Sequence, residues 1–530
     1  MPAGTYYDSL RQQIGKPGRQ LGNHSTDAAS FIMERQRMIT AVLPRSHHPR
    51  FERFLEELLR NPLIRKAVLL HSGDPGRLPP RCEAVAVDGP VSGGTWNSLV
   101  AGAATRYLLF FSDAAGVRTD PHAPDRLIEA AEAAGAGVAY ADYAEISGKA
   151  IREHPLNDYQ TGSLRDGFDF GPLILLSRAA ARSAIRKYGE MPAYRWAGWY
   201  DLRLKISADH DLFHLPERLS MIEATPAEAG KDGRAHFAYV DPRNRPLQEE
   251  MEAVATAHLK RIGAWLAPEF SEVPPSADPF PVEASVIIPV RNRVRTVADA
   301  VQSAFAQRTD FPFNVIVVDN HSTDGTTAVL AGLAGRNPAL KHCVPERYDL
   351  SIGGCWNEAI FSAACGRYAV QLDSDDLYRG EDVLKRLVDL LRGENCAMAI
   401  GAYTLVDEWL REIPPGLIDH REWTDANGRN NALRINGLGA PRAFATAALR
   451  RIGFPNVGYG EDYAVALRLS REYRIGRIYE SLYLCRRWAG NTDAALSVEQ
   501  ANRHDHYKDR LRTLEIRARR KMNEVTGWKP

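Results

Sequence analysis

The chain has 530 residues, which is too long for one ordinary hydrophobic core and predicts two or three domains. A hydrophobic content of 44%, a charged content of 25% and a net charge of +1 are typical of a soluble globular protein and exclude a strong general attraction to nucleic acid. We see neither an apolar run that could span a bilayer nor a secretory pattern, so we expect a cytoplasmic protein. Its cysteines form no C-x-x-C pair, which indicates reduced core thiols.

The first half alternates short apolar runs with helical spacing. Residues 1–37 are polar and aperiodic and predict an N-terminal arm. The predicted strands span residues 38–44, 65–70, 83–87 and 107–111, and the predicted helices span residues 51–59 and 97–104. Because strands that alternate with helices favour a parallel sheet, we expect residues 38–265 to form a first α/β domain.

A proline-rich stretch separates this half from a second one. Residues 266–283 have no helical pattern and predict a semi-rigid linker. The same order of elements then begins again, and we expect a second domain at residues 284–495. Its predicted strands span residues 284–289, 313–319 and 368–372, and its predicted helices span residues 297–305 and 357–364.

The last segment, residues 496–530, contains a basic run of helical pattern from Tyr507 to Lys521. One interpretation is an interfacial helix that contacts anionic lipid. The apolar face of this helix is narrow, which favours a docked or solvated helix instead.

Short sequence matches connect the two halves. Gly93–Asn97 matches Gly353–Asn357, Val42–Pro44 matches Ile287–Pro289, and residues 196–207 align without gaps to residues 459–470. Three matches in the same order predict an internal duplication.

The halves differ where strands end in polar turns. Leu372-Asp-Ser-Asp-Asp376 of the second half stands opposite Phe111-Ser-Asp-Ala-Ala115 of the first. Ser112 and Ala114 therefore replace two carboxylates, and Trp199 likewise replaces Asp462. We predict that the first half keeps the fold and lacks the catalytic groups.

Three carboxylates of the second half, Asp373, Asp375 and Asp376, crowd together after a short apolar run. Carboxylates this close repel one another unless a cation lies among them. An all-oxygen site that bridges to phosphates is typical of Mg²⁺ or Mn²⁺. The alternative is a solvated acidic turn. The matching turn of the first half lacks the outer acids, so the fold does not need them, and this favours ligand binding.

Further polar signals lie at strand ends, where open α/β sheets bind ligands. Asp319 ends a predicted strand, and Thr323 or Asp324 after it is predicted to cap a helix. Gly353 and Gly354, with Asn357, either let the backbone approach a ligand or form a plain turn.

Glu461 and Asp462 begin a helical pattern. Acidic residues are favoured at a helix N-terminus, and a carboxylate in that place can also serve as a base in a cleft. The two interpretations are compatible.

Four motifs occur in one order over residues 284 to about 490, namely Ser285–Asn292, Val317–Asp324, Leu372–Asp376 and Gly460–Tyr463. On these motifs, the second half resembles a family 2 glycosyltransferase with the GT-A fold. The resemblance implies an α/β protein of two tandem GT-A domains, Rossmann-like and mostly parallel, of which the first is degenerate and non-catalytic. It also implies an inverting enzyme of the hexosyltransferase type.

The resemblance assigns roles to individual positions. In the family, residues at Pro289, Val290, Arg291 and Asp319 bind the nucleobase and ribose of a nucleotide-sugar. Asp373 and Asp375 would contact ribose and a diphosphate-bound Mn²⁺ or Mg²⁺, and Asp462, beside Glu461, would be the catalytic base. We place Ser374, Gly354 and Asn357 in the same donor site.

The family pattern is not complete in this chain. Many relatives carry a histidine ligand where Trp488 stands, which puts a third protein ligand to the metal in doubt. Arg486 or Arg487 could clamp the diphosphate instead. The alternative is a surface basic pair.

Direct displacement at an anomeric carbon needs a neutralised leaving group, a base on the opposite face and alignment of both. We therefore expect metal-assisted transfer of a sugar from a nucleotide-sugar, UDP-sugar by family frequency, to a hydroxyl of a glycan or lipid-linked saccharide. This predicts a role in polysaccharide biosynthesis, in the cytoplasm or at the inner face of the membrane. The protein could also form a homo-oligomer. Two alternative functions stay open, namely a non-catalytic nucleotide-sugar-binding or scaffold protein and a sugar nucleotidyltransferase. The glycine-free Val290–Arg293 argues against the nucleotidyltransferase.

Overall fold

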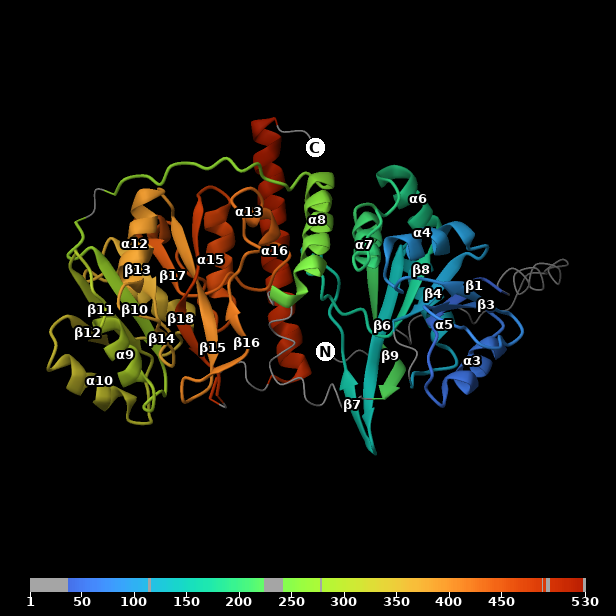
Figure 1. Cartoon of the computed structure of the whole chain (residues 1–530), viewed down its shortest axis with the longest axis horizontal. Coiled ribbons are helices and arrows are strands. Elements are labelled where there is room, and N and C mark those ends of the chain that lie inside the picture. The colour runs from blue at the N-terminus through green and yellow to red at the C-terminus, as the bar shows by residue number, and fades with distance from the viewer. Residues whose placement is uncertain are drawn as a thin grey trace, which may run out of the picture.

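The computed structural model describes residues 37–112, 116–223, 242–276, 279–488, 490–491 and 496–527. Within these ranges the chain forms two α/β domains that lie side by side (Figure 1). The predicted N-terminal arm lies outside the described residues except for Arg37, and so does Ala114. The prediction of two tandem α/β domains is confirmed.

The first domain is built on one mixed sheet. Its strands are β1 (Ile39–Pro44), β2 (Ile64–His71), β3 (Cys82–Ala86), β4 (Tyr107–Phe111), β5 (Arg118–Thr119), β6 (Val138–Ser147), β7 (Ala150–His154), β8 (Leu173–Ser177) and β9 (Leu212–Glu223). Its helices are α3 (Phe51–Arg60), α4 (Gly93–Gly102), α5 (Ala123–Ala134), α6 (Arg178–Tyr188) and α7 (Gly198–Ser207). A short 3-10 turn (Pro242–Asn244) and helix α8 (Arg245–Arg261) follow the described part of this domain.

The second domain repeats this order. Its strands are β10 (Ala284–Val290), β11 (Phe313–Asp319), β12 (Leu340–Cys343), β13 (Tyr368–Gln371), β14 (Leu377–Tyr378), β15 (Met398–Val406), β16 (Glu412–Ile418), β17 (Arg442–Ala445) and β18 (Ile475–Arg486). Its helices are α9 (Val297–Phe305), α10 (Thr326–Ala334), α11 (Ile352–Phe361), α12 (Val383–Gly393), α13 (Gly428–Asn431), α14 (Thr446–Arg450) and α15 (Glu461–Ser470), and the chain continues into α16 (Val498–Thr526).

The two sheets have one topology. The strand order is β3-β2-β1-β4-β8-β6-β9-β5 in the first domain and β12-β11-β10-β13-β17-β15-β18-β14 in the second, with β7 and β16 each paired at the side. In both, the first four strands are parallel, which is the Rossmann-like half that the sequence predicts, and the fifth runs antiparallel to them. The same order twice in one chain confirms the predicted duplication.

Helices cover both faces of each sheet because the central strands are apolar on both sides. In the second domain every residue of β10 is buried. Val286 and Ile288 pack in the cluster that contains α9 and α12, and Ile287 packs in the cluster of α11 and α15. The last cluster also contains Leu204 of α7 and residues of α8 and α16, so one apolar core extends through both domains.

Helices α8 and α16 stand between the two sheets (Figure 1). Ile516 of α16 is fully buried, and so are Arg512 and Arg519 of the same helix. The structure therefore shows the docked alternative for the basic C-terminal helix, because its narrow apolar face is covered by protein. Arg510, Arg517, Arg520 and Lys521 remain exposed.

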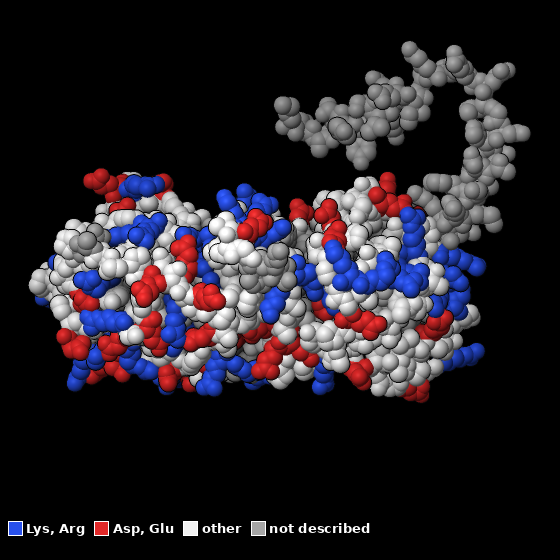
Figure 2. All heavy atoms as spheres, turned by 90° about the horizontal axis from the view of Figure 1, so that it is seen from above, with Lys and Arg blue, Asp and Glu red and all other residues white. Residues whose placement is uncertain are grey.

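Charges of both signs are spread over both domains on the face shown in Figure 2. Within the described ranges, none of the helices combines the length and hydropathy that crossing a bilayer requires. All six cysteines are free, and Cys355, Cys365 and Cys396 are buried as predicted, whereas Cys343 is exposed.

Candidate active site

The candidate site lies at the carboxyl ends of β10, β11 and β13, where two loops are bound to each other. The Asn292 side-chain oxygen accepts a 2.7 Å hydrogen bond from the N–H of Thr323, and Asp324 accepts one of 3.0 Å from the N–H of Val294. Asp324 also accepts from the N–H of Thr326 at the start of α10. The residue at the N-cap position is Gly325 and not the predicted Thr323 or Asp324, and the bonds of Asn292 and Asp324 instead hold the β10 loop against the β11 loop.

Asp319 ends β11 and is completely buried. Its carboxylate accepts hydrogen bonds from the N–H of Ser322 at 3.0 Å and from the hydroxyl of Thr327 at 2.5 Å, and His342 Nε2 lies 3.5 Å away. Burial alone would raise the pKa of Asp319, but the hydrogen bonds from Ser322 and Thr327 hold that pKa below its ordinary value. The structure thus keeps a charged carboxylate at the mouth of the strand.

Asp373 and Asp376 lie just beyond β13, in the turn that Asp375 shares. Burial, followed by repulsion from Asp375 and Asp373, raises the pKa of Asp376 well above its usual range. Burial also raises the pKa of Asp373, although Arg442 and Gln371 offset part of this shift. The N–H of Arg486 donates to Asp376 over 2.7 Å, so Asp376 is tied to β18.

Asp375 faces nitrogen donors. The indole Nε1 of Trp488 donates to its Oδ2 over 3.2 Å, Asn491 Nδ2 lies at 3.4 Å, and Arg293 Nε lies at 3.5 Å. Trp488, which stands where the family pattern would place a histidine ligand, therefore lies beside Asp375. An indole N–H is a donor only and cannot ligate a cation.

Glu461 and Asp462 begin α15, as the sequence predicts. Burial raises the pKa of Glu461. The Asp462 carboxylate is paired with the guanidinium of Arg442, whose Nε donates to Gln371 Oε1 over 2.8 Å. Gln371 Nε2 in turn donates to both oxygens of Asp373, at 2.9 and 3.0 Å.

The base candidate and the first carboxylate of the D-x-D motif are thus joined by two side chains. Sequence reasoning missed both Arg442 and Gln371 because neither belongs to a recognisable motif. A comparison of strand positions between the halves could have found them, since the first domain has apolar residues at both places.

The remaining predicted site residues surround this centre. Pro289 and Val290 are buried at the end of β10, where Val290 pairs in register with Asp319, and Arg291 is exposed directly after them. Ser374 is buried, and its carbonyl accepts from Thr296 Oγ1 at the start of α9.

Arg486 is the last residue of β18, and Arg487 follows it. The guanidinium of Arg486 is buried and reaches Asp299 at 3.4 Å, while its Nε has no hydrogen-bond partner among the described residues. The N–H of Arg487 donates to the carbonyl of Val406. Arg486 is therefore not a surface residue.

Two predicted donor-site residues make structural contacts within a helix. Gly354 and Asn357 lie inside α11, which begins at Ile352, and not in a loop before it. A Cβ on Gly354 would come within 2.5 Å of Asn456 Oδ1. The Asn357 amide donates to the carbonyl of Phe454 and accepts from its N–H, both at 2.8 Å. These bonds tie α11 to a neighbouring loop. The expectation that Gly354 and Asn357 lie before the helix is therefore wrong, and their place in the donor site stays a prediction.

The first domain fills the corresponding place with aromatic rings. Trp199, opposite Asp462, lies 4.9 Å from Trp96 and 6.5 Å from Phe110 between ring centroids. Ser112, opposite Asp373, donates to the carbonyl of Gly171. The described residues at these positions of the first domain carry no carboxylate.

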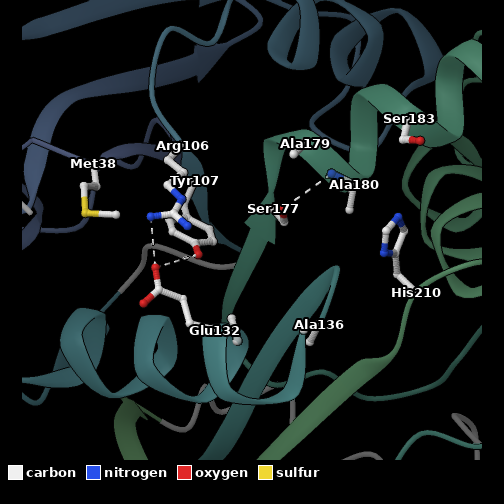
Figure 3. Close-up of a pocket in the computed structure, with 12 residues that line it drawn as sticks. Met38, Arg106, Tyr107, Glu132, Ala136, Ser177, Ala179, Ala180, Ser183 and His210 are labelled. Carbon is white, nitrogen blue, oxygen red and sulfur yellow. Dashed lines mark hydrogen bonds and ion pairs between the residues drawn. The ribbon is translucent and has the colours of Figure 1, made fainter. Parts of the chain in front are cut away.

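A cavity of about 750 Å³ lies elsewhere in the first domain. Met38 and Tyr107 line it at the amino ends of β1 and β4. The candidate site of the second domain lies at the carboxyl ends of the equivalent strands. In Figure 3 the side chains of Arg106 and Tyr107 point to Glu132, with which they form an ion pair and a hydrogen bond. Arg106, Tyr107 and Glu132 thus satisfy one another in this cavity, which does not include Asp319, Asp373 or Asp375 of the candidate site.

Comparison with known proteins identifies the second domain. Residues 285–454 match the profile described as "Glycosyl transferase family 2". The chain is 30% identical over 122 residues to TuaG of Bacillus subtilis (strain 168), named for teichuronic acid biosynthesis, covering 23% of this chain and 47% of TuaG. It is 25% identical over 203 residues to an uncharacterised glycosyltransferase of Rickettsia conorii, covering 37% of this chain and 32% of that protein.

Among solved structures, S. aureus TarS 1-349 in complex with UDP-GlcNAc matches with a TM-score of 0.35 and 23% identity, over 44% of this chain and 66% of TarS. The chain spans 29% of the length of the first curated relatives that it matches, proteins of Mycobacterium bovis and Mycobacterium tuberculosis that carry no functional name. The family match lies on β10 to α14, the part of the chain that carries Asp319, Asp373 and Asp375. The second α/β domain of this chain is therefore a family 2 glycosyltransferase domain.

Proposed function

We propose that this protein is an inverting glycosyltransferase that moves a sugar from a UDP-sugar to a hydroxyl of a glycan or lipid-linked saccharide. The observation that carries the proposal is the bonded series Asp462, Arg442, Gln371 and Asp373, which lies at the strand ends of a family 2 domain. The series connects the base candidate to Asp373, which would hold the cation of the leaving diphosphate. The match to a polysaccharide enzyme by name, TuaG, supports a saccharide acceptor.

The donor would bind along the β10 and β11 ends. Asp319 is completely buried, so it would act on the donor through the β11 loop, which its bonds from Ser322 and Thr327 hold in place. Pro289 to Arg291 form the adjacent wall. Arg486 has a buried Nε without a partner among the described residues, which supports its role as a donor of hydrogen bonds to the diphosphate.

The carboxylates fit a divalent cation. Asp373 and Asp375 repel each other in a site that raises the pKa of Asp373, and this is the environment in which a bound cation is stabilised. Asp373 and Asp375 would hold the Mn²⁺ or Mg²⁺, and among the described residues no third His, Cys, Asp or Glu completes a metal-binding group with them. When bound, the cation neutralises the charge that develops on the leaving diphosphate.

Asp462 would act as the base. Its carboxylate is partly exposed at the N-terminus of α15, where an acceptor hydroxyl can reach it. As the hydroxyl oxygen bonds to the anomeric carbon, its proton passes to Asp462, and the bond from that carbon to the diphosphate oxygen breaks. A single displacement of this kind inverts the anomeric configuration.

The first domain would be non-catalytic and would support the second through the shared core. Its aromatic residues Phe110 and Trp199 fill the positions at which the second domain keeps Gln371 and Asp462, and Trp96 packs against both of these rings. A cytoplasmic location, with contact to the inner face of the membrane, stays a prediction from the sequence.

The proposal is tested by a screen of nucleotide-sugars that monitors nucleotide release, with and without MnCl₂. We expect cation-dependent release by the wild-type protein and a loss of about 100-fold or more for Asp375→Asn and for Asp462→Asn, the range seen when a group that stabilises the transition state is removed. Asp382→Asn, an exposed aspartate before α12, is the matched control and should turn over normally. Binding of UDP with Mn²⁺ but no turnover of any donor would favour the binding or scaffold alternative.

A further inference from the structure

We propose that Arg442 is a positioning residue that couples the base Asp462 to the D-x-D carboxylate Asp373 through Gln371. The inference rests on the proposed function. It assigns a role to two residues that lie outside the motifs of the site.

Arg442 lies where it can contact both groups. It is the first residue of β17, and its side chain is only 14% exposed. One arm of the guanidinium pairs with Oδ2 of Asp462, and its Nε donates to Gln371 Oε1 over 2.8 Å. The direction of the guanidinium is therefore set by two partners at once, because its N–H groups diverge in one plane.

Gln371 connects the guanidinium of Arg442 to the carboxylate of Asp373. It is buried at the end of β13, with its amide oxygen used by Arg442 and its amide nitrogen used by both oxygens of Asp373. The amide cannot rotate without breaking both contacts. Asp373 and Asp462 are thereby held in a fixed relation, although they come from different elements.

The first domain provides an internal comparison. Strand register places Phe110 at the position of Gln371, because each pairs with the equivalent residue of the central strand, Val42 or Ile287. It places Ile174 at the position of Arg442, three residues before the residue that caps the next helix in both domains. Trp199 is the second residue of α7, as Asp462 is of α15.

All three polar groups are thus replaced together by apolar ones. Phe110 and Ile174 are buried in one apolar cluster, against which Trp199 packs. A domain of the same topology therefore folds without the polar series. Because the series is present only beside the D-x-D carboxylates, we infer that it serves the reaction and not the fold.

The experiment measures kcat and donor KM for full-length variants at saturating Mn²⁺, with the donor that the screen identifies. Arg442→Gln should lower kcat by about 10- to 100-fold, as loss of an outer partner of a functional group does. Arg442→Lys, which keeps the charge but can contact only one partner well, should recover part of that loss. Gln371→Met should instead raise the dissociation constant of UDP with Mn²⁺ by about 10-fold, since Asp373 loses its two N–H donors.

A double-mutant cycle separates positioning from a structural role. In the Asp462→Asn background, Arg442→Gln should lower kcat by less than about a further twofold, because Arg442 acts through the carboxylate that is already changed. Arg450→Gln is the matched control, since Arg450 lies on the neighbouring helix α14 and donates to the carbonyl of Ile360. It should keep wild-type kcat.

Two results would overturn the inference alone. One is a normal kcat for Arg442→Gln in an enzyme that Asp462→Asn inactivates. The other is a loss in the double variant equal to the product of the two single losses. Failure of the wild-type protein to turn over any nucleotide-sugar would instead refute the proposed function, and with it this role of Arg442.

Discussion

At the scale of single residues, the site is defined by how its carboxylates are paired. Asp319 is surrounded by donors and holds its charge, whereas burial and mutual repulsion raise the pKa of Asp373 and Asp376. Asp375 has the donors of Trp488, Asn491 and Arg293 around it. Asp319, Asp373 and Asp376 thus differ in the direction of their pKa shifts because their partners come from different elements.

The raised pKa values predict how pH and a cation act on stability. A carboxyl whose folded pKa is raised stays protonated in the folded state after it ionises in the unfolded chain, so its contribution to stability is lost as pH rises through the folded value. Without a cation, the site should therefore destabilise the protein as pH rises above about 4, the ordinary pKa of an aspartate, and MnCl₂ should restore part of the unfolding temperature, by about 2–4 °C for each kcal/mol of binding free energy. The measurement is a thermal melt at several pH values.

Asp375→Asn provides the contrast for this experiment. It removes the charge that repels Asp376, so the cation-free variant should melt higher than the wild type at pH 8 and should gain little from MnCl₂. An equal MnCl₂ shift in wild type and variant would show that the cation binds elsewhere.

At the scale of elements, both domains contain the same contact between a helix and a neighbouring loop, which we call the brace. Gly353 in the first turn of α11 lies against the carbonyl of Pro455, and Gly93 of α4 lies against that of Pro192. The Asn97 amide bonds the backbone of Met191 as Asn357 bonds that of Phe454. The matched sequence Gly-Gly-x-Trp-Asn thus records packing between a helix and a loop, and for this reason it survives in a domain without catalytic groups.

The brace predicts equal effects of one substitution in both halves. A Cβ at Gly353 or Gly93 would lie 1.9 Å from a proline carbonyl oxygen, so Gly353→Ala and Gly93→Ala should each lower the free energy of unfolding by about 1–3 kcal/mol, the usual cost of overpacking. Gly332→Ala in α10 is the control, because a Cβ at that position would point into open space and alanine favours a helix. Urea unfolding measures all three. A neutral Gly93→Ala would contradict the equivalence of the two braces.

At the scale of the whole molecule, α16 joins the domains by a buried polar network. Asp509 accepts from Ser163 Oγ of the first domain at 2.8 Å and pairs with Arg512 at 2.7 Å. Arg512 Nε donates to the hydroxyl of Tyr463, next to Asp462, over 2.9 Å. Asn523 near the end of the helix donates to the carbonyl of Gly263. The first domain therefore contacts the helix that carries the base through one intermediate helix.

This network predicts a large effect of one arginine and a small effect of its neighbour. Arg512→Met removes the closer of the two arginines that pair with buried Asp509 and leaves only Arg165, at 3.4 Å, so it should destabilise the protein by about 3–5 kcal/mol, the cost of breaking a buried pair. Arg517→Met, at an exposed position of the same helix, should change stability by no more than about 0.5 kcal/mol. Chemical unfolding followed by circular dichroism distinguishes them. Equal melting of the two variants would mean that α16 is not part of the core.

Much of this architecture follows from local sequence signals. Alternating apolar runs predict β1, β2, β10, β11 and β13, and the repeated order predicts two domains, because strand and helix periods depend on neighbouring residues only. The carboxylates at the ends of β11 and β13 and at the start of α15 are recognisable for the same reason: strand ends and helix starts are set locally.

Other features depend on which elements meet in space. Gly354 and Asn357 had the composition of a ligand loop, and only their contacts with Asn456 and Phe454 show that they pack inside α11. Arg442 is separated from Gln371 by 71 positions and has no motif, so its place between Asp462 and Asp373 arises from antiparallel pairing of β17 with β13. The basic C-terminal helix gave no local sign that Arg512 and Arg519 would be buried. The sequence by itself determined the two domains and the acidic groups of the second; the tertiary structure decided how those groups are connected, because contacts across a sheet and between domains join residues that no local pattern relates.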